Sequence, residues 1–485
     1  ENEMPTVYEY EDSDESKTFK IGDQLTADQK AELLELLNSF GEVFSSKTGK
    51  TDMVEHKITL LHNKPCRQAM YKIPHAIRDK VEVQLNKLLE EGVIAESQTG
   101  GYSAPLVCVK KRNGDIRLCC NYSRLNDATA PDDYPMPDCA AILNKAAGSR
   151  YISTMDLKNF YYQIPLCAES QPLTAFDTEF GRFHWLRAPQ GLKHSGKTAQ
   201  RLIEKLLRSA NRYAAAMIDD ICIFSASWDQ HIKHIRDILM RLKKAGLSAN
   251  TEKCQWARER VQILGHELYN GTVAPSDEKI RAVSEIKSIS SKKQLQSWLG
   301  LCNYYRDHIR SFSEHSAVLT ELLKRKVPED LTKIWNVQHQ QAFEALREAL
   351  LVKPILRPVH PDRQYILQTD ACNRSIGYIL SQIDENGTEY VVSYGSRKVK
   401  DRETRYSTIE QECLALVTGA LKYEQYIYGK HVIVHCDHQP LSFLSQMENN
   451  NSRLMRWSLI LQRFDFEIQY RKARFHGNVD AISRL

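Results

Sequence analysis

The chain has 485 residues and a formal net charge of +5, and hydrophobic residues make up 42% of it. This length exceeds what one hydrophobic core usually holds, so we expect roughly three or four packing units. The mild positive charge permits a polyanionic partner without requiring one. No apolar run approaches the length of a membrane span and no CxxC pair occurs, which argues against a membrane protein, a zinc ribbon and a thioredoxin-type site.

The N-terminal part combines an acidic tail with helical patterns. Residues 1–25 contain many Asp and Glu residues, and we expect them to be a disordered tail. A helix is predicted to begin after Thr26, which is a suitable N-cap residue. Residues 76–96 repeat aliphatic residues at a helical period, which predicts a second helix.

The next segment changes to strand-like patterns. Pro105–Val109 and Ile116–Tyr122 are predicted to form a hairpin, because the Asn-Gly pair between them is a strong signal for a tight turn. The tip of this hairpin is cationic and includes Lys111, with Arg117 just behind it. A solvated Lys/Arg turn is an equally good interpretation of such a run taken alone.

Two strand ends in the middle of the chain carry carboxylates. Residues 151–156 are predicted to be a strand that ends at Asp156. The apolar runs 213–218 and 221–224 predict a second hairpin, with Asp219 and Asp220 at its tip. Taken alone, an Asp-Asp pair is a surface turn with odds of about four in five.

If these elements are neighbours in one sheet, Asp156, Asp219 and Asp220 converge. Like charges at such a place need neutralising cations, and Mg²⁺ with carboxylate and phosphate oxygens is the natural solution. Two such ions between carboxylates support in-line phosphoryl transfer. The cationic tip with Lys111 and Arg117 would then bind a triphosphate.

Helices and short strands are predicted over the rest of the first three quarters of the chain. Proline residues in 327–362 indicate a connecting region. The predicted elements are a hairpin over 176–186, a helix from about 193 to 209, an amphipathic helix over 228–246, a strand over 263–268 that turns at 270–271, and a helical region over 276–326.

A second module begins at Arg363. The predicted strands are 365–370, 377–382, 390–394 and 432–437, and the predicted helix is 407–425. Four carboxylates stand out in this framework: Asp370, Glu412, Asp437 and Asp480. Each alone has odds of about one in ten of being functional. Their joint placement at strand ends and in an apolar helix favours a two-metal site with water as the nucleophile.

A series of short motifs follows in order along most of the chain. They are Val109–Arg117, Leu125–Asn126, Met155–Leu157, Ala175–Phe176, Pro189–Lys193, Ile218–Ile221, Ile263–His266, Trp298–Leu301, Tyr304–Arg306, Thr369–Ala371, Tyr406–Glu412, Cys436–Leu441 and Asn478–Arg484. Each motif is weak alone. Their order resembles the reverse transcriptase/ribonuclease H region of gypsy-type LTR retrotransposon Pol polyproteins, from about residue 43 to the end.

The resemblance implies an α/β (α+β) fold: a right-hand polymerase of fingers, palm and thumb, a connection, and a C-terminal ribonuclease H fold with a mixed five-stranded sheet. The implied division is an acidic disordered tail (1–25), an N-terminal helix and fingers (26–150), a palm with an interleaved fingers segment (151–272), a thumb (273–326), a connection (327–362) and a ribonuclease H domain (363–485).

The resemblance also implies roles for single residues. The polymerase metal ligands are matched by Asp156, Asp219 and Asp220, and the nuclease metal ligands by Asp370, Glu412, Asp437 and Asp480. The nucleotide-binding positions are matched by Lys111, Arg117, Tyr161, which would exclude a ribose 2′-OH, and Gln190, which would lie near the sugar 3′-OH. The primer and template positions are matched by Met217, Leu264, Gly265, His266 and Trp298. His476 matches a product-release position, for which a surface His is an equally good interpretation.

The implied activity is RNA-directed DNA synthesis on RNA or DNA templates by two-metal nucleotidyl transfer, with ribonuclease H cleavage of the RNA strand in RNA–DNA hybrid. The implied cofactor is Mg²⁺, with Mn²⁺ as the alternative, two ions per site. The implied partners are an RNA template, a DNA primer, RNA–DNA hybrid and deoxynucleoside triphosphates, with no membrane; the oligomeric state stays open. The expected location is intracellular and cytoplasmic, including virus-like particles, with access to the nucleus.

Three residues depart from the family pattern: Met217 stands where Tyr is usual, Gly196 where Pro is usual, and Ala199 where Phe is usual. They leave a second interpretation, a polymerase-impaired remnant that acts as a nucleic-acid-binding module. A third interpretation, a DNA-templated repair polymerase, leaves the C-terminal carboxylates unexplained. Neither a protease motif nor an integrase core is visible, so we expect the middle of a polyprotein or a remnant of one.

Overall fold

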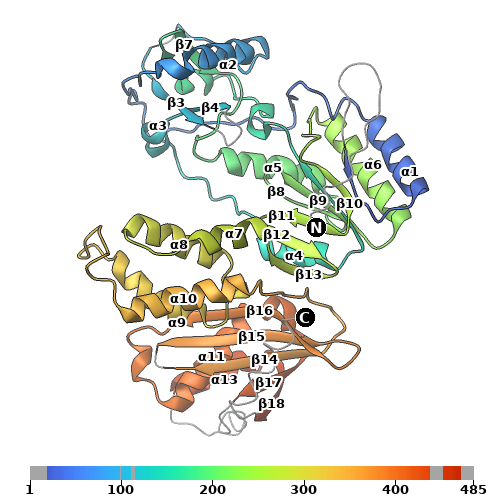
Figure 1. The fold of residues 1–485 in the computed structure, drawn as a ribbon, viewed down its shortest axis with the longest axis vertical. Coiled ribbons are helices and arrows are strands. Elements are labelled where there is room, and N and C mark those ends of the chain that lie inside the picture. Colours follow the sequence, from blue (N-terminus) through green and yellow to red (C-terminus); the bar gives the residue numbers. More distant parts are fainter. Residues whose placement is uncertain (1–18, 99, 111–114, 373, 437–451, 471–485) are drawn as a thin grey trace. The chain divides into compact units, whose positions relative to one another are not determined.

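The computed structural model describes residues 19–98, 100–110, 115–372, 374–436 and 452–470. They form two compact units (Figure 1). The first contains the described residues up to Ile142 together with Ser149–Ile263, and the second contains Leu143–Gly148 together with the described residues from Leu264 onward. The finer six-part division stays a prediction. In the described ranges, no helix has both the length and the apolar character needed to cross a membrane.

The first unit contains two mixed sheets of five strands each. After the subdomains that the resemblance implies, we call the sheet with the order β1-β10-β5-β9-β8 the palm sheet and the sheet with the order β2-β7-β6-β3-β4 the fingers sheet. The palm strands are β1 (Lys20–Ile21), β5 (Tyr151–Asp156), β8 (Ala214–Met217), β9 (Asp220–Ser225) and β10 (Gln255–Arg258). The fingers strands are β2 (Ile94–Glu96), β3 (Ala104–Lys110), β4 (Ile116–Cys120), β6 (Phe176–Thr178) and β7 (Gly181–Trp185).

Helices and short 3₁₀ turns surround these sheets. They are α1 (Ala27–Asn38), η1 (His75–Ile77), α2 (Arg78–Glu90), α3 (Ser123–Asp127), α4 (Cys139–Ala147), η2 (Phe160–Gln163), η3 (Gln171–Thr174), α5 (Ser195–Leu207) and α6 (Trp228–Lys244), followed by the strand β11 (Arg260–Ile263). The helix predicted after Thr26 is confirmed, because Thr26 and Gln29 form a capping box at the start of α1.

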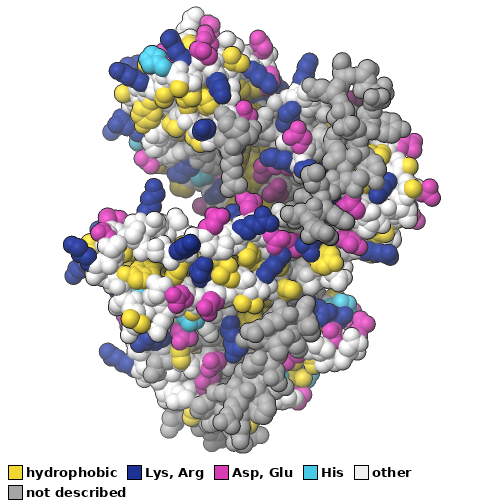
Figure 2. All heavy atoms as spheres, in the orientation of Figure 1, with side chains coloured by type: hydrophobic (Ala, Val, Ile, Leu, Met, Phe, Trp, Pro, Cys, Tyr) yellow, Lys and Arg dark blue, Asp and Glu magenta, His cyan; other side chains and the backbone are white. Residues whose placement is uncertain are grey.

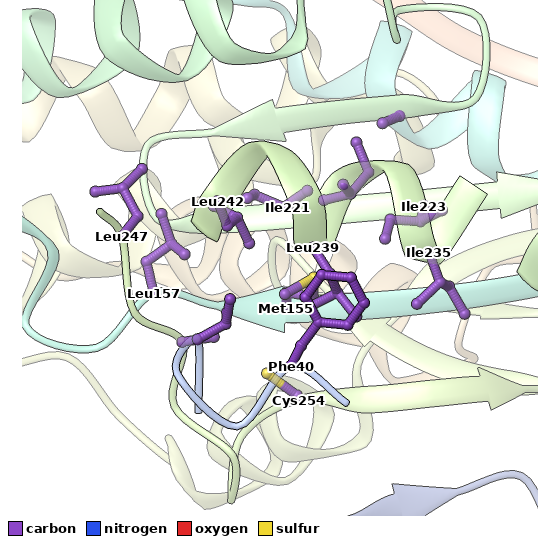
Figure 3. Packing of buried hydrophobic residues seen from close by; sticks show 14 of the residues in the cluster. Phe40, Met155, Leu157, Ile221, Ile223, Ile235, Leu239, Leu242, Leu247 and Cys254 are labelled. Carbon is purple, nitrogen blue, oxygen red and sulfur yellow. The ribbon is translucent and has the colours of Figure 1, made fainter. Parts of the chain in front are cut away.

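The core of the palm holds the carboxylate-bearing strands in place. Leu239 and Leu242 of α6 pack toward Met155 of β5 and Ile221 of β9 (Figure 3). Met155 and Ile221 are opposite each other in the β5–β9 register, and both are buried. Each is the immediate neighbour of an aspartate, so packing of the core fixes the strand ends that carry the acidic groups.

The second unit begins with a hairpin and a cluster of helices. Its core includes Trp298 of α8 and Phe343 and Leu346 of α10. The elements are β12 (His266–Tyr269), β13 (Thr272–Pro275), α7 (Asp277–Glu285), α8 (Lys292–Tyr304), η4 (Arg306–His308), α9 (Phe312–Thr320), η5 (Glu321–Leu323) and α10 (Val337–Leu351).

The C-terminal module contains the expected mixed five-stranded sheet, with the order β16-β15-β14-β17-β18 (Figure 1). β14 is antiparallel to β15 and parallel to β17, and α11 packs against β14. The segment Leu143–Gly148 belongs to this second unit, where Asn144 Nδ2 donates to Tyr426 Oη at 3.2 Å. The elements are β14 (Tyr365–Ala371), β15 (Ser375–Ile383), β16 (Glu389–Lys398), η6 (Glu403–Arg405), α11 (Thr408–Lys422), α12 (Glu424–Ile427), β17 (His431–Cys436), α13 (Ser452–Leu461) and β18 (Asp465–Tyr470).

Two N-terminal predictions are wrong in part. Residues 19–25 are not a disordered tail, because Phe19 and Ile21 are each only 1% exposed and β1 pairs with β10. The acidic composition of the segment as a whole concealed these apolar residues, and residues 1–18 lie outside the described ranges. The helix predicted over 76–96 ends at Glu90, since Gly92 adopts a φ of 61° and the chain continues as strand β2.

Two later predictions are also corrected. The strand predicted over 263–268 is interrupted, because Leu264 and Gly265 adopt φ values of 48° and 68° and form a turn. The region 327–362 is not only a connection. It contains α10, whose N-terminus is closed by a capping box of Asn336 and His339.

Candidate active sites

The structure places the three central aspartates at one end of the palm sheet. In the antiparallel pairing of β5 and β9, Asp156 lies directly opposite Asp220. Asp219 lies beside them in the two-residue turn of the β8–β9 hairpin, where Met217 pairs with Asp220. The Leu157 N–H donates to the Asp219 carbonyl at 3.1 Å, which ties this turn to the end of β5. The convergence expected from the sequence is therefore built by strand register.

A buried glutamine holds the turn that carries Asp219. Ile218 has a φ of 56°, which is strained for a β-branched residue. Its N–H donates to Gln200 Oε1 at 2.9 Å, and Gln200 is 1% exposed on α5. Sequence reasoning missed Gln200 as a functional residue. The available signal was a polar residue within the apolar face of a predicted amphipathic helix.

Asp156 and Asp220 lie in surroundings that disfavour their ionised forms. Burial, followed by the charges of Asp219 and Asp156, raises the pKa of Asp220 to about 6. Burial also raises the pKa of Asp156, while Lys253 opposes that shift. Lys253 Nζ lies 3.2 Å from Asp156 Oδ2, so a cation already partly neutralises the cluster. Lys253 was not identified from the sequence.

The aspartates at the end of the palm sheet fit a metal ion whose remaining ligands come from a substrate. Among the described residues, no group of three or more His, Cys, Asp or Glu side chains is arranged to hold a metal ion unaided. Mg²⁺, however, usually binds through one or two carboxylates and completes its shell with water and substrate phosphates. Asp156 and Asp220 on facing strand positions supply such a pair.

The nucleotide-binding candidates are only partly brought together. Tyr161 is half-buried on η2, and burial followed by the negative charge of Asp219 raises the pKa of its hydroxyl. Gln190 is half-buried in the loop before α5, which Asn126 holds by donating to the Gly191 carbonyl at 2.8 Å. Arg117 is exposed on β4, and Lys111 lies outside the described residues.

Met217 and the turn at 264–265 are half-buried. Met217 Sδ is 3.5 Å from Cys139 Sγ. Leu264 and Gly265 form the turn before β12, and their carbonyls accept hydrogen bonds from the Tyr304 and Tyr305 hydroxyls at 2.5 and 2.6 Å. The geometry of this turn is therefore fixed by aromatic side chains of α8 and the residue after it.

Two of the predicted primer and template contacts are buried. Trp298 is 1% exposed, and its ring centroid is 5.0 Å from that of Phe343 inside the helical core. His266 is 5% exposed and stacks 5.3 Å from His308. Both side chains are enclosed by protein, and the role of these two positions in primer and template binding stays a prediction. They stabilise the segments on which they lie.

The second carboxylate set is described only in part. Asp370 is exposed near the end of β14, and Glu412 is 3% exposed on α11, the helix that packs against β14. A pocket of about 110 Å³ adjoins Asp370, with Arg310, Tyr378 and Tyr394 among its lining residues. Asp437, His476 and Asp480 lie outside the described residues.

Family models match both halves of the chain. The model described as reverse transcriptase (RNA-dependent DNA polymerase) matches residues 109–268. The model described as an RNase H-like domain found in reverse transcriptase matches residues 360–464. The first match contains all three palm aspartates, and the second contains Asp370 and Glu412.

The curated relatives are retrotransposon polyproteins. The retrovirus-related Pol polyprotein from transposon 297 of Drosophila melanogaster is 31% identical over 471 residues, covering 96% of this chain and 44% of the relative. That from transposon opus of the same fly is 33% identical, covering 93% and 46%. The transposon Tf2-3 polyprotein of Schizosaccharomyces pombe is 30% identical, covering 86% and 31%. The chain thus spans less than half the length of these relatives.

Solved structures of similar fold come from foamy virus. The foamy viral protease-reverse transcriptase in complex with ds DNA matches with a TM-score of 0.80 at 21% identity, covering 93% of this chain and 80% of that chain. The same enzyme in complex with RNA/DNA hybrid matches with a TM-score of 0.75 at 22% identity, covering 93% and 61%. This likeness confirms the α/β fold. Together with the family models and the relatives, it shows that the chain belongs to the reverse transcriptase/ribonuclease H region of gypsy-type LTR retrotransposon Pol polyproteins.

Proposed function

We propose that the chain copies RNA and DNA templates into DNA and cleaves the RNA strand of RNA–DNA hybrid. The observation that carries the polymerase half is the strand register that sets Asp156 opposite Asp220, with Asp219 in the adjoining turn. This arrangement puts three acidic groups at one sheet end, where buried apolar neighbours hold them. Such a cluster is suited to gather cations and phosphate oxygens.

Asp156, Asp219 and Asp220 would hold Mg²⁺, or Mn²⁺, at two ions per site. The ions would activate the primer oxygen and steady the departing pyrophosphate. Tyr161 stands beside Asp219, where the sugar of an incoming nucleotide would lie, and Arg117 with Lys111 would bind the triphosphate. Lys253 would remain as a positive charge next to Asp156.

A nucleic-acid duplex is the proposed partner. The foamy viral neighbours are described in complex with ds DNA and with RNA/DNA hybrid, and this chain shares their fold. Figure 2 shows Lys and Arg side chains interspersed with Asp and Glu on the face in view, so the mild positive charge is not gathered into one patch there. Binding would therefore depend on local phosphate contacts and weaken with salt. An intracellular, cytoplasmic location is part of this proposal.

Primer extension on an RNA template with Mg²⁺ tests the polymerase half. We expect the intact chain to extend the primer, and Asp219→Asn to lose extension while it still cleaves hybrid. The reverse is expected for Glu412→Gln. Asp237→Asn is the matched control, because it weakens a half-buried ion pair with Arg241 on α6 and should keep both activities. Failure of the intact chain to extend any primer would refute the polymerase proposal.

The interpretation of the chain as a polymerase-impaired remnant predicts a different result in the same assay. It expects salt-sensitive binding of hybrid without nucleotide incorporation, and activity that appears only in Met217→Tyr with Ala199→Phe. Ala199 is 0% exposed in the palm core, so a Phe there must displace its neighbours at a cost of about 1–3 kcal/mol. The core has thus closed around the smaller side chain, and we expect the intact chain, not the double variant, to be the active form.

A further inference from the structure

Gln163 anchors the short turn that carries Tyr161. It is the last residue of η2 and is 0% exposed. Its Nε2 donates to the carbonyls of Lys158 at 2.5 Å and Ser248 at 2.9 Å. Its Oε1 accepts from the Ser248 N–H at 2.8 Å. The side-chain amide of Gln163 therefore bonds only to the backbone of Lys158, just before η2, and of the distant Ser248. This makes it an anchor and not a reactive group.

A strap of residues 49–51 closes over the same turn. The Gly49 N–H donates to Ser248 Oγ at 3.0 Å, and the Thr51 N–H donates to the Gln163 carbonyl at 2.9 Å. A Cβ added to Gly49 would lie 2.4 Å from the Gly246 carbonyl oxygen and 2.7 Å from Gln163 Oε1. Only glycine fits this approach, so the strap is packed directly on the anchor.

A buried guanidinium links the strap to η2. Arg187 is 8% exposed and donates from Nη1 to the Gly49 carbonyl at 2.6 Å and to the Tyr162 carbonyl at 3.1 Å. Its guanidinium group thus donates to backbone carbonyls of separate segments. The turn is thereby held at two consecutive residues, Tyr162 and Gln163.

Tyr161 comes directly before these two attachments in η2, and its hydroxyl lies within the electrostatic influence of Asp219. Its hydroxyl is 3.7 Å from the point where a Cβ on Gly196 would lie, and its side chain packs against the palm core. Selecting one sugar hydroxyl by contact requires the selecting ring to be held to a fraction of an ångström. A four-residue 3₁₀ turn has too few internal hydrogen bonds to do so alone.

We propose that Gln163, with the strap 49–51 and Arg187, positions Tyr161 and so sets the discrimination between deoxyribonucleoside and ribonucleoside triphosphates. The inference rests on the proposed polymerase function. It assigns a role in nucleotide selection to residues 49–51, which precede the matched reverse transcriptase region of 109–268. The anchor acts through Tyr161 and does not touch the substrate.

Gln163→Leu tests the anchor, because it keeps the approximate size of the side chain and removes its hydrogen bonds. The matched control is Gln382→Leu in the second unit. Gln382 is also 0% exposed, and its Nε2 donates to the carbonyls of His360 and Arg363. For both variants, the ratio of kcat/KM for a deoxyribonucleotide to that for the matching ribonucleotide is measured on one primer–template, alongside thermal unfolding. We expect the ratio to fall about tenfold in Gln163→Leu and to stay unchanged in Gln382→Leu.

The outcomes separate this inference from the polymerase proposal. If the intact chain incorporates no nucleotide, the proposed function fails and the inference fails with it. If the intact chain is active and a folded Gln163→Leu keeps the intact ratio within about twofold, only the inference is refuted. Should Gln163→Leu not fold, Ser248→Ala removes only the side-chain acceptor of the Gly49 N–H. Its ratio must fall in the same direction, and an unchanged ratio overturns the positioning role.

Discussion

Replacing Gln200 by Leu should show how strongly the strained turn depends on one side chain. Gln200 Oε1 accepts the Ile218 N–H at 2.9 Å, and Nε2 donates weakly to the Ala216 carbonyl at 3.4 Å and to Glu204 at 3.0 Å. Leu keeps the apolar contacts of α5 with the palm core. It removes the acceptor that holds Ile218 in its left-handed conformation.

The expected loss can be worked out from these contacts. Leaving a buried backbone donor without its partner costs about 1–3 kcal/mol, and the left-handed φ of Ile218 itself stores about 1–3 kcal/mol that the turn can then release. A shift of about 2 kcal/mol away from the native turn lowers the equilibrium constant for forming it about 30-fold. Since Asp219 sits in that turn, we expect kcat for extension to fall by up to this factor with KM for the nucleotide nearly unchanged.

Steady-state primer extension and urea unfolding would be compared for Gln200→Leu and Arg201→Met. Arg201 forms a two-bond ion pair with Asp132 at 2.6 and 2.8 Å and does not contact the turn. Its replacement should cost about 1 kcal/mol of unfolding free energy and leave kcat intact. If Gln200→Leu loses stability while its kcat stays within about twofold of the intact chain, the turn does not depend on this hydrogen bond.

Three further predictions concern a buried tryptophan, a glycine in helix α5 and a buried histidine. Trp298→Ala should lower the unfolding free energy by about 3–5 kcal/mol while the affinity of the folded protein for a nucleic-acid duplex stays the same, and a lowered affinity in a protein of intact stability would show that Trp298 does contact the duplex. Gly196→Ala should be tolerated and gain about 0.5–1 kcal/mol in unfolding experiments, because its Cβ would be 3.7 Å from the Tyr161 hydroxyl; a loss of stability would contradict this. Burial, with a smaller effect of His234, lowers the pKa of His231 from 6.5 to about 3. Between about pH 3 and pH 6.5, the unfolded chain therefore binds one more proton than the folded chain, and the free energy of unfolding falls as the pH falls. His231→Gln should reduce the slope of the unfolding free energy against pH by about 1.4 kcal/mol per pH unit. An unchanged slope would refute the assignment.

Periodicity in the sequence was sufficient to predict the main strands and the carboxylates at their ends. Alternating apolar runs on both sides of Asp219 and Asp220 predict a hairpin, and the hairpin is present with its turn at Ile218 and Asp219. What periodicity could not provide was the pairing partner. Only the register of β5 on β9 sets Asp156 opposite Asp220, because that pairing joins segments far apart in the chain.

The supporting residues were beyond the reach of sequence patterns for a physical reason. Gln163, Gln200 and Arg187 act through hydrogen bonds to the backbone of distant segments, and such bonds leave no local period. Conversely, Trp298 lies in a motif matched to nucleic-acid contact but is buried. A motif identifies a position in the fold, whereas exposure decides whether the side chain there can reach a ligand.

The assignment of Leu143–Gly148 to the second unit limits how the molecule can be divided. Leu143, Ala146 and Ala147 are buried, and Asn144 bonds to Tyr426 far along the chain. A fragment that stops at Ile263 would keep this segment but lose the partners of its unit, and would present its apolar residues to water. The two units are thus interlaced along the sequence. A fragment of the first unit obtained by a single cut would need replacement of these residues by polar ones to stay in solution.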